Sequence, residues 1–402
     1  MTDISTADTS CPPVAHVLRR LSIEAVETTQ IRVPLGRVYR GSHYHMTHRS
    51  TVVTRIRASD GIVGEAYVGD ENAGLGQIVD IIHGEIAPQL LGQDAFAIER
   101  CWELARPATF DILRDRRLGL VACACLDTAI WDAVGKALGE PLWRLWGGYR
   151  DNLPMISIGG YYGHDLDAEV EVLLDRGLAG MKLKVGGASP EHDAERFARV
   201  RAIAGDSFIL GADANQGYTV QEAIRFARLV EPHRLDWFEE PCRWHNDKLA
   251  MRDVRMLAGV CVTAGQSEYS ASGCRDLMAA GAIDICNFDA SWSGGPTEWR
   301  RAAAVAATYD VRMGHHEEPQ VASHLLASIP HGVFVECFDP DRDPIWWNLV
   351  ANRPALEGGN LRLPHSPGLG WELDLDYIEA HRVGDVRTTD TGNNDPTALE
   401  VS

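Results

Sequence analysis

After Pro154, short apolar segments alternate with amphipathic segments, and this rhythm restricts the possible folds more than any other feature of the chain. Each apolar segment has strand length and is followed by a stretch with helical periodicity. Strands that alternate with helices form parallel sheets, and a long series of such units predicts a closed barrel. The strand candidates are MISIGGY, GMKLKV, FILGADA, LDWFEEP, CVTAGQS, DICNFDA, VRMGHH and VFVECF.

The chain before this barrel has a different pattern. The segments SIEAVETTQIRVPL and RSTVVTRIRASDGIVGEAYVG are strand-like, and helical patterns follow them, which predicts an α+β domain. The polar, aperiodic ends are typical of disordered tails. We therefore expect five parts: a tail at 1–18, the α+β domain at 19–145, the barrel at 146–345, a segment that packs back on the first domain at 346–383, and a tail at 384–402.

Composition limits the classes of partner and compartment. The 38 Lys+Arg and 57 Asp+Glu residues give a net charge of −19, which argues against nucleic acid or an anionic membrane as the main partner. The nine cysteines are odd in number and include no Cys-x-x-Cys pair, so we expect reduced thiols. We find no apolar run of membrane-span length and no apolar signal core. The expectation is a soluble, cytoplasmic protein.

Charged or imidazole side chains lie near the ends of seven successive strand candidates. They are roughly 20–30 residues apart, which is the length of one strand–helix unit. The carboxyl ends of parallel barrel strands meet at one rim, where barrel enzymes carry their catalytic residues. We therefore expect a metal site with proton-transfer groups. The series is Lys182 with Lys184, Asp213, Glu239, Gln266 or Glu268, Asp289, His316 and Glu336.

Lys182 and Lys184 lie two residues apart on one strand candidate, so their side chains share a face. Adjacent ammonium groups repel each other, and we expect this repulsion to lower the pKa of at least one lysine into the range of a useful base. The alternative is an edge strand with two solvated lysines.

The acids of the next two strands suggest a metal. Asp213 shares a strand face with Asn215, and of the adjacent Glu239 and Glu240 only one can point inward, for which we select Glu239. With a third carboxylate they would form an all-oxygen site, which suits Mg²⁺ first and Mn²⁺ second, whereas zinc prefers nitrogen and sulfur. Each acid taken singly is equally explained as a helix cap or an ion-pair partner.

His315 and His316 are neighbours, so one faces the barrel axis and the other faces away as a structural histidine. We assign the inward position to His316. Asp289, one strand earlier, is placed to bond His316 and fix its tautomer. A histidine opposite a lysine would supply proton-transfer groups on both faces of one substrate. The alternative is a pair of unrelated core histidines.

The loop VYRGSHYHMTHRS of the first domain carries Arg40 and His43. We expect this loop to close over the barrel mouth, where Arg40 and His43 would bind the far end of a polyol or a second carboxylate. A plain solvated loop explains the same residues equally well.

Taken in order, these motifs resemble the enolase superfamily, and specifically its mandelate racemase subgroup. The resemblance covers roughly residues 20–385, and the motifs that carry it are ACLDTAIWDAVGKALGEPLWRLWGG, MKLKVG, GADANQG, WFEEP, NFDASWSGG, the His-His pair and the late Glu336. It implies an α/β fold with a modified (β/α)₇β barrel under an α+β capping domain. It also implies a homo-oligomer, one Mg²⁺ per subunit bound by three carboxylates, and a base that removes the proton α to a substrate carboxylate.

The resemblance also implies a role for each matched residue. Lys184 would be the base on one face, and His316, oriented by Asp289, the acid or base on the other. Lys182 and Glu336 would bind the substrate carboxylate, with Asn215 beside them. Asp213 and Glu239 would bind the metal.

One position departs from the family pattern. Where the family carries Gly-Glu for its third metal ligand, this chain has Gly265-Gln266-Ser267-Glu268. We expect Glu268 to supply the third carboxylate from a shifted strand end, or Gln266 to bind through its carbonyl oxygen. The predicted metal ligands are therefore Asp213, Glu239 and Glu268.

Three functions remain open at this point. The first is an acid-sugar dehydratase that acts on an aldonate or aldarate and forms a 2-keto-3-deoxy acid, favoured by the polar loop with Arg40 and His43. The second is a racemase, epimerase or cycloisomerase that uses the same ene-diolate chemistry. The third is an inactive barrel kept for binding, with the altered third ligand as its sign.

Overall fold

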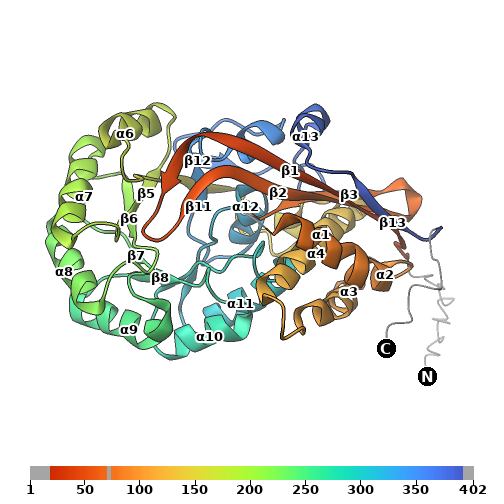
Figure 1. Ribbon diagram of the computed structural model, residues 1–402, viewed down its shortest axis with the longest axis horizontal. Coiled ribbons are helices and arrows are strands. Elements are labelled where there is room, and N and C mark those ends of the chain that lie inside the picture. The colour runs from red at the N-terminus through yellow and green to blue at the C-terminus, as the bar shows by residue number, and fades with distance from the viewer. Residues whose placement is uncertain (1–18, 70–73, 393–402) are drawn as a thin grey trace, which may run out of the picture.

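The computed structural model describes residues 19–69 and 74–392, and within them the chain forms two sheets (Figure 1). The smaller sheet is antiparallel, with strand order β13-β1-β2-β3. Its strands are β1 (Ile23–Arg40), β2 (His45–Ala58), β3 (Val63–Val68) and β13 (Arg387–Asp390). Five helices follow it: α1 (Leu75–Ile81), α2 (Ala87–Leu90), α3 (Ile98–Ala105), α4 (Arg116–Leu138) and α5 (Leu142–Leu145).

The larger sheet is the predicted barrel. Its parallel strands follow the order β10-β9-β8-β7-β6-β5-β4-β11, and the Met313–Gly332 bridge joins β10 to the segment before β11. The strands are β4 (Asn152–Gly159), β5 (Gly180–Lys184), β6 (Ile209–Asp213), β7 (Phe238–Glu239), β8 (Val262–Ala264), β9 (Ile285–Cys286), β10 (Arg312–Met313) and β11 (Val335–Phe338).

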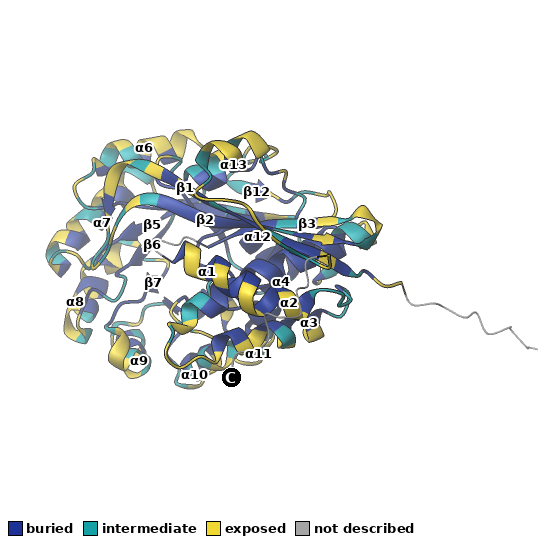
Figure 2. Ribbon diagram, turned by 45° about the vertical axis from the view of Figure 1, so that its right-hand side comes forward, coloured by how far each residue is buried: buried dark blue, intermediate teal, exposed yellow. Residues whose placement is uncertain are grey.

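A helix follows each barrel strand except the last, which gives the modified (β/α)₇β arrangement predicted from the sequence. The helices surround the strands, and their outer faces are exposed while the strands are buried (Figure 2). They are α6 (Leu166–Asp175), α7 (Pro190–Ala204), α8 (Val220–Val230), α9 (Asp247–Ala258), α10 (Ala271–Ala279), α11 (Pro296–Thr308) and α12 (Pro319–Ser328).

Helix α4 lies at the centre of the first domain and packs on β2, β3 and α11. By length and composition it could cross a membrane, contrary to our expectation that no apolar run reaches that length, but 89% of its most apolar window is buried inside the protein. A helix that is apolar on all sides is typical of a protein core when other elements surround it. We therefore describe α4 as a core helix.

The end of the chain returns to both domains. Strand β12 (Asn360–Arg362) pairs with β4 at the foot of the barrel, and α13 (Leu375–His381) packs on β1. Residues 387–390 lie in the segment expected to be a tail, but they form β13, which pairs antiparallel with β1. Their alternation is too short to distinguish from a polar loop, so the sequence alone missed this edge strand. The expected tail at 1–18 and residues 393–402 lie outside the described residues.

Candidate active site

The register of the barrel strands brings the predicted residues to one rim. Lys184 is the last residue of β5 and pairs with Asp213, the last residue of β6, which pairs with Glu239 at the end of β7. Paired residues of parallel strands point to the same side of a sheet, so these side chains form a row inside the barrel. All three are at most 3% exposed.

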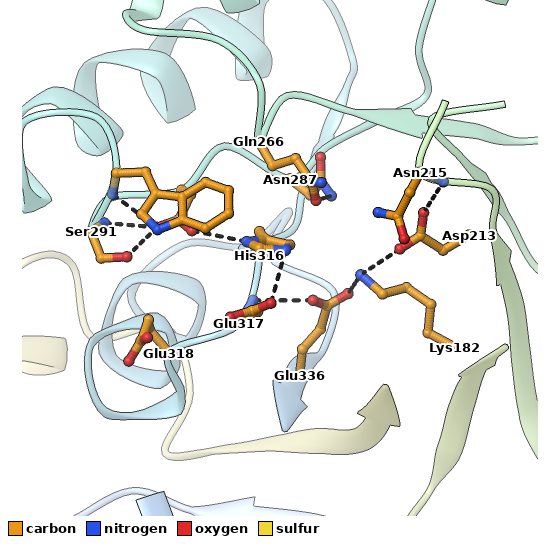
Figure 3. A network of polar contacts seen from close by, with 12 residues as sticks. Lys182, Asp213, Asn215, Gln266, Asn287, Ser291, His316, Glu317, Glu318 and Glu336 are labelled. Atoms are coloured by element: carbon orange, nitrogen blue, oxygen red, sulfur yellow. Dashed lines mark hydrogen bonds and ion pairs between the residues drawn. The ribbon is translucent and has the colours of Figure 1, made fainter. Parts of the chain in front are cut away.

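The two lysines are held by carboxylates. The Lys182 ammonium lies 2.7 Å from Glu239 Oε1. It also lies 2.6 Å from Glu336 Oε1 (Figure 3). The Lys184 ammonium lies 2.7 Å from Asp213 Oδ2 and donates to Asn215 Oδ1 at 2.9 Å. Each lysine therefore has an acid as its nearest charged partner.

This pairing reverses the expected pKa shift of the lysines. Burial lowers the pKa of both, but the neighbouring carboxylates outweigh burial and hold each pKa above its usual value. For Lys182 the carboxylates are Glu239, Glu336 and Asp213, and for Lys184 the main one is Asp213. Our expectation of a lowered pKa was wrong for this form of the protein because it counted only the repulsion between the lysines and omitted the acids that face them.

His316 lies on the other side of the rim, after β10. Its Nδ1 is 2.9 Å from Asp289 Oδ2, as predicted, and its Nε2 is 3.2 Å from Glu317 Oε1. Burial lowers the pKa of His316, but contact with the two carboxylates holds it well above its usual value. Around the barrel, β5 and β10 are separated by β4 and β11 on one side and by β6 to β9 on the other, so Lys184 and His316 approach the barrel mouth from opposite sides.

His315 is the structural histidine that the sequence predicts. Its Nε2 accepts a hydrogen bond from the backbone N–H of Ala290 at 3.0 Å, and its Nδ1 donates to the carbonyl of His316 at 2.9 Å. Burial lowers the pKa of His315, so the ring is neutral. Both nitrogens are used inside the protein, and the ring orients the backbone of its neighbour.

The structure places Glu268, the predicted third metal ligand, away from the row of strand ends. Strand β8 ends at Ala264, and the bond from Glu268 N to the carbonyl of Gly265 (3.0 Å) closes a turn. The side-chain alternation of a strand therefore stops before residue 268. The Glu268 carboxylate lies against Gly273 of α10 and interacts with the charge of Lys248, so the structure does not bring it to Asp213 and Glu239.

Gln266 instead points into the mouth (Figure 3). Its Nε2 donates to Glu240 Oε2 at 3.2 Å, and its Oε1 accepts from Asn287 Nδ2 at 3.5 Å. Glu240 has a left-handed backbone (φ 36°), and its carboxylate also accepts from Ser267 Oγ at 2.6 Å. Because of this turned backbone, both glutamates of WFEEP are buried at the rim, whereas strand alternation allows only one of them to face inward.

The available oxygens suit a hard divalent cation. Burial raises the pKa of Glu239 to about 8, although Lys182 opposes the shift, and its Oε2 is buried without a hydrogen-bond partner. Asn287 Oδ1 is buried in the same way. Within residues 19–69 and 74–392 no three His, Cys, Asp or Glu side chains form a metal-binding group, so a third protein ligand beside Asp213 and Glu239 would be the amide oxygen of Gln266.

The hairpin between β1 and β2 reaches over the barrel mouth, as the loop was expected to do (Figure 1). Ser42 Oγ donates to the carbonyl of Asn215 at 3.0 Å, and the Tyr44 ring centroid lies 5.8 Å from the Lys184 ammonium. Arg40 and His43 are exposed, and His43 contacts Arg243 at 3.2 Å. The hairpin thus presents Tyr44, rather than Arg40 or His43, to the predicted base.

Sequence reasoning missed several residues of this site. Glu317 and Tyr44 contact the predicted acid and base directly, and Glu240 contacts Gln266. The sequence does contain a signal for both acids: Glu240 is the second residue of the Glu-Glu pair, and Glu317 follows the His-His pair. The direction in which these two side chains point depends on left-handed backbone angles (φ 36° at Glu240 and 54° at Glu317), which a strand pattern does not predict.

Comparison with known proteins shows which family has this arrangement of domains. Residues 25–147 match the mandelate racemase/muconate lactonizing enzyme N-terminal domain, and residues 165–377 match the enolase C-terminal domain-like family. A 3,6-anhydro-alpha-L-galactonate cycloisomerase of Streptomyces coelicolor is 30% identical over 90% of this chain and 100% of its own length. An L-talarate/galactarate dehydratase of Salmonella typhimurium is 29% identical over 87% of this chain and 89% of its own length.

Solved structures agree with the fold. A mandelate racemase/muconate lactonizing enzyme from a marine actinobacterium, in complex with magnesium, is 57% identical, covers 90% of this chain and 100% of its own, and superposes with a TM-score of 0.87. Another mandelate racemase/muconate lactonizing enzyme is 60% identical with the same coverage and a TM-score of 0.90. The chain therefore belongs to the mandelate racemase subgroup of the enolase superfamily.

Proposed function

We propose that this protein is a Mg²⁺-dependent dehydratase of acid sugars, an aldonate or an aldarate. The observation that carries the proposal is the pair of proton-transfer groups on opposite sides of one buried mouth. Lys184 lies beside the carboxylate-rich β5–β7 side, and the carboxylate-bound His316 lies on the β9–β10 side. Relatives that include an L-talarate/galactarate dehydratase and an arabinonate dehydratase support the substrate class.

Asp213, Glu239 and Gln266 would hold the metal, as the oxygen donors at adjacent strand ends. Bound there, Mg²⁺ supplies positive charge that offsets the metal-side carboxylates and the two oxygens of an ene-diolate. Lys182 and Glu336, in contact at 2.6 Å, would bind the substrate carboxylate. Their burial excludes water from that end of the substrate and strengthens each charged contact.

In the proposed reaction, Lys184 takes the proton from C2 of the sugar acid as a neutral amine, which requires that Asp213 bind the metal rather than the ammonium. His316 then donates its Nε2 proton to the hydroxyl that leaves C3 as water, and the enol that remains tautomerises to a 2-keto-3-deoxy acid. Asp289 keeps the imidazole oriented through Nδ1. Tyr44 covers Lys184 and would keep the base out of bulk solvent.

A cycloisomerase is the second candidate, because two of the curated relatives carry that activity. It would use the same α-proton abstraction, and His316 would then give its proton to a ring oxygen or to carbon. A racemase or epimerase would use the same intermediate, with His316 giving its proton to carbon. We also propose a reducing, cytoplasmic compartment, which is supported by the free thiols of Cys101, Cys123, Cys242, Cys261, Cys274, Cys286 and Cys337. We also propose a homo-oligomer, because Phe110, Ile112 and Leu113 are exposed together on one loop.

The test is a screen of the purified protein with Mg²⁺ against a panel of mono- and diacid sugars, with Lys184→Ala assayed alongside. A 2-keto-3-deoxy product that disappears in the variant would support the dehydratase. Deuterium from the solvent in recovered substrate or an isomer, without a keto product, would favour the second candidate. The absence of turnover, of deuterium exchange and of bound metal would contradict both and favour a barrel used for binding.

A further inference from the structure

The His316 ring is held between two buried carboxylates. Asp289 Oδ2 lies 2.9 Å from Nδ1. Glu317 Oε1 lies 3.2 Å from Nε2 (Figure 3). Carboxylates only accept hydrogen bonds, so a ring with one on each nitrogen carries a proton on each nitrogen. The geometry therefore defines His316 as an imidazolium in the resting protein, and Glu317 is the residue that occupies the nitrogen facing the mouth.

The position of Glu317 is imposed by the fold. Glu317 and Glu318 have φ angles of 54° and 48°, which are unfavourable for residues other than glycine. The Glu317 N–H donates to Glu336 Oε2 at 3.1 Å, and the Glu318 carboxylate forms a 2.6 Å ion pair with Arg49 of β2. These contacts fix the strained pair from both domains. Backbone strain that the surroundings maintain in this way is typical of functional sites.

The charges around His316 leave a net preference for the protonated ring. Contacting groups come from the β9–α11 loop, where Trp292 also packs on the ring at a centroid distance of 4.8 Å, and from the residue after His316 itself. Other charges act at longer range, on the ring or on Glu317. The facing titratable and charged groups are Asp289, Glu317, His315, Glu240, Arg342 and Arg49.

An imidazolium donates a proton but cannot accept one, and this asymmetry decides between the two outcomes of an ene-diolate. We propose that Glu317 commits the enzyme to elimination, because it keeps His316 an acid and prevents it from removing the α proton from the second face of the substrate. This inference rests on the proposed function. Glu317 is assigned here as a positioning residue that acts through His316.

The step balances without another reactant. Lys184 takes the C2 proton, and the electron pair of that C–H bond enters the ene-diolate. This electron pair then forms the C2–C3 double bond as the C3–O bond breaks. The departing oxygen takes the Nε2 proton of His316 and leaves as water, and the neutral ring regains a proton from solvent beside Glu317. Without Glu317, a neutral ring could instead take the C2 proton of the opposite epimer.

The decisive test uses Lys184→Ala, in which any α-proton exchange must come from His316. With the C2 epimer of the substrate in deuterated water at pD 8, Lys184→Ala should exchange no measurable deuterium. The double variant Lys184→Ala/Glu317→Gln should exchange at a rate at least about tenfold above the detection limit that bounds Lys184→Ala, since loss of one charge contact that shifts the His316 pKa by one unit changes the neutral fraction tenfold. Equal rates in the two variants would overturn the proposal.

A second measurement needs no substrate and so separates this proposal from the function on which it rests. In protein with isotope-labelled histidine, the His316 signal is assigned by its absence in His316→Gln and titrated by NMR. Glu317→Gln should move its midpoint down by one pH unit or more, Glu317→Asp by less, and the exposed Glu171→Gln of α6 should not move it. An unchanged midpoint in Glu317→Gln overturns the proposal even if no acid sugar is converted. If Glu317→Gln does not fold, an unchanged His316 midpoint in Glu317→Asp also overturns the proposal.

Discussion

Two regions of this protein that contain buried polar groups use them differently. At the domain junction, defined here by Asp132 of α4, His324 of α12 and their backbone partners, the side-chain donors and acceptors bond to the protein itself. At the barrel mouth, defined by the lysines, acids and His316 of the strand ends, charges pair with other charges, and Glu239 Oε2 and Asn287 Oδ1 have no hydrogen-bond partner.

The difference indicates what each region does. The junction completes its hydrogen bonds in the resting protein, so it orients the domains and stabilises the fold. The mouth keeps several charges in a buried site, a costly arrangement that a ligand or metal ion can complete. Substitutions at the junction should therefore reduce stability, and substitutions at the mouth should reduce ligand binding and turnover.

The largest stability effect is expected for Asp132→Ala. Asp132 Oδ1 accepts from Leu369 N at 2.7 Å, and Oδ2 accepts from Glu65 N at 2.8 Å and contacts the Lys136 ammonium at 2.7 Å. Its removal leaves two backbone N–H groups without an acceptor, so the free energy of unfolding should fall by roughly 3–5 kcal/mol. Urea unfolding of the wild type and the variant measures this difference in the free energy of unfolding. Asp132→Asn keeps one oxygen acceptor and should lose less; equal losses would contradict the role of the oxygens.

His324 should make the junction sensitive to acid. Its Nδ1 accepts from Trp143 N at 3.2 Å and its Nε2 donates to the carbonyl of Leu369 at 2.8 Å, so the ring must be neutral. Burial lowers its pKa to about 3. A lowered folded-state pKa gives stability that is present above the unfolded value of about 6.5 and is lost as the pH falls toward 3.

At pH 4 the loss attributable to His324 should be about 3 kcal/mol. His324→Gln can still accept from Trp143 and donate to Leu369, so it should cost little at pH 7 and remove this part of the acid sensitivity. Unfolding free energies of both proteins at pH 7, 5 and 4 provide the test. Parallel pH curves for wild type and His324→Gln would assign the acid sensitivity to other groups.

Both regions were only partly predictable from the sequence. The row of Lys184, Asp213 and Glu239 was predictable because each residue ends a regular strand, and parallel register fixes the face. Glu268 was misplaced because β8 ends at Ala264 and the chain turns before the next strand position. Glu317 was missed because its left-handed backbone breaks the alternation on which such predictions depend. Junction partners such as Leu369 lie far from α4 in the sequence, so no local sequence pattern predicts their contact with Asp132.

Magnesium should stabilise the mouth and leave the junction unchanged. At a free concentration one hundred times the Kd, Mg²⁺ should raise the free energy of unfolding by about 2.7 kcal/mol relative to protein in EDTA. Gln266→Leu and Glu239→Gln should lose most of this gain, because each removes an oxygen from the proposed site. Glu268→Gln is the matched control, since its carboxylate lies against α10, and it should keep the gain. Loss of the gain in Glu268→Gln alone would restore Glu268 as the third ligand.

The smallest effect is expected where the first domain touches the mouth. The Tyr44 ring lies 5.8 Å from the Lys184 ammonium, and the hairpin tip is attached by the 3.0 Å bond from Ser42 to Asn215. A partly exposed cation–π contact contributes about 0.5–1 kcal/mol, so Tyr44→Leu should raise the KM of the acid-sugar substrate by about two- to fivefold and leave the urea midpoint unchanged. Tyr44→Phe retains the ring and should behave as wild type. A lowered urea midpoint in Tyr44→Leu would place Tyr44 with the junction, because its main contribution would then be to packing rather than to the covered base.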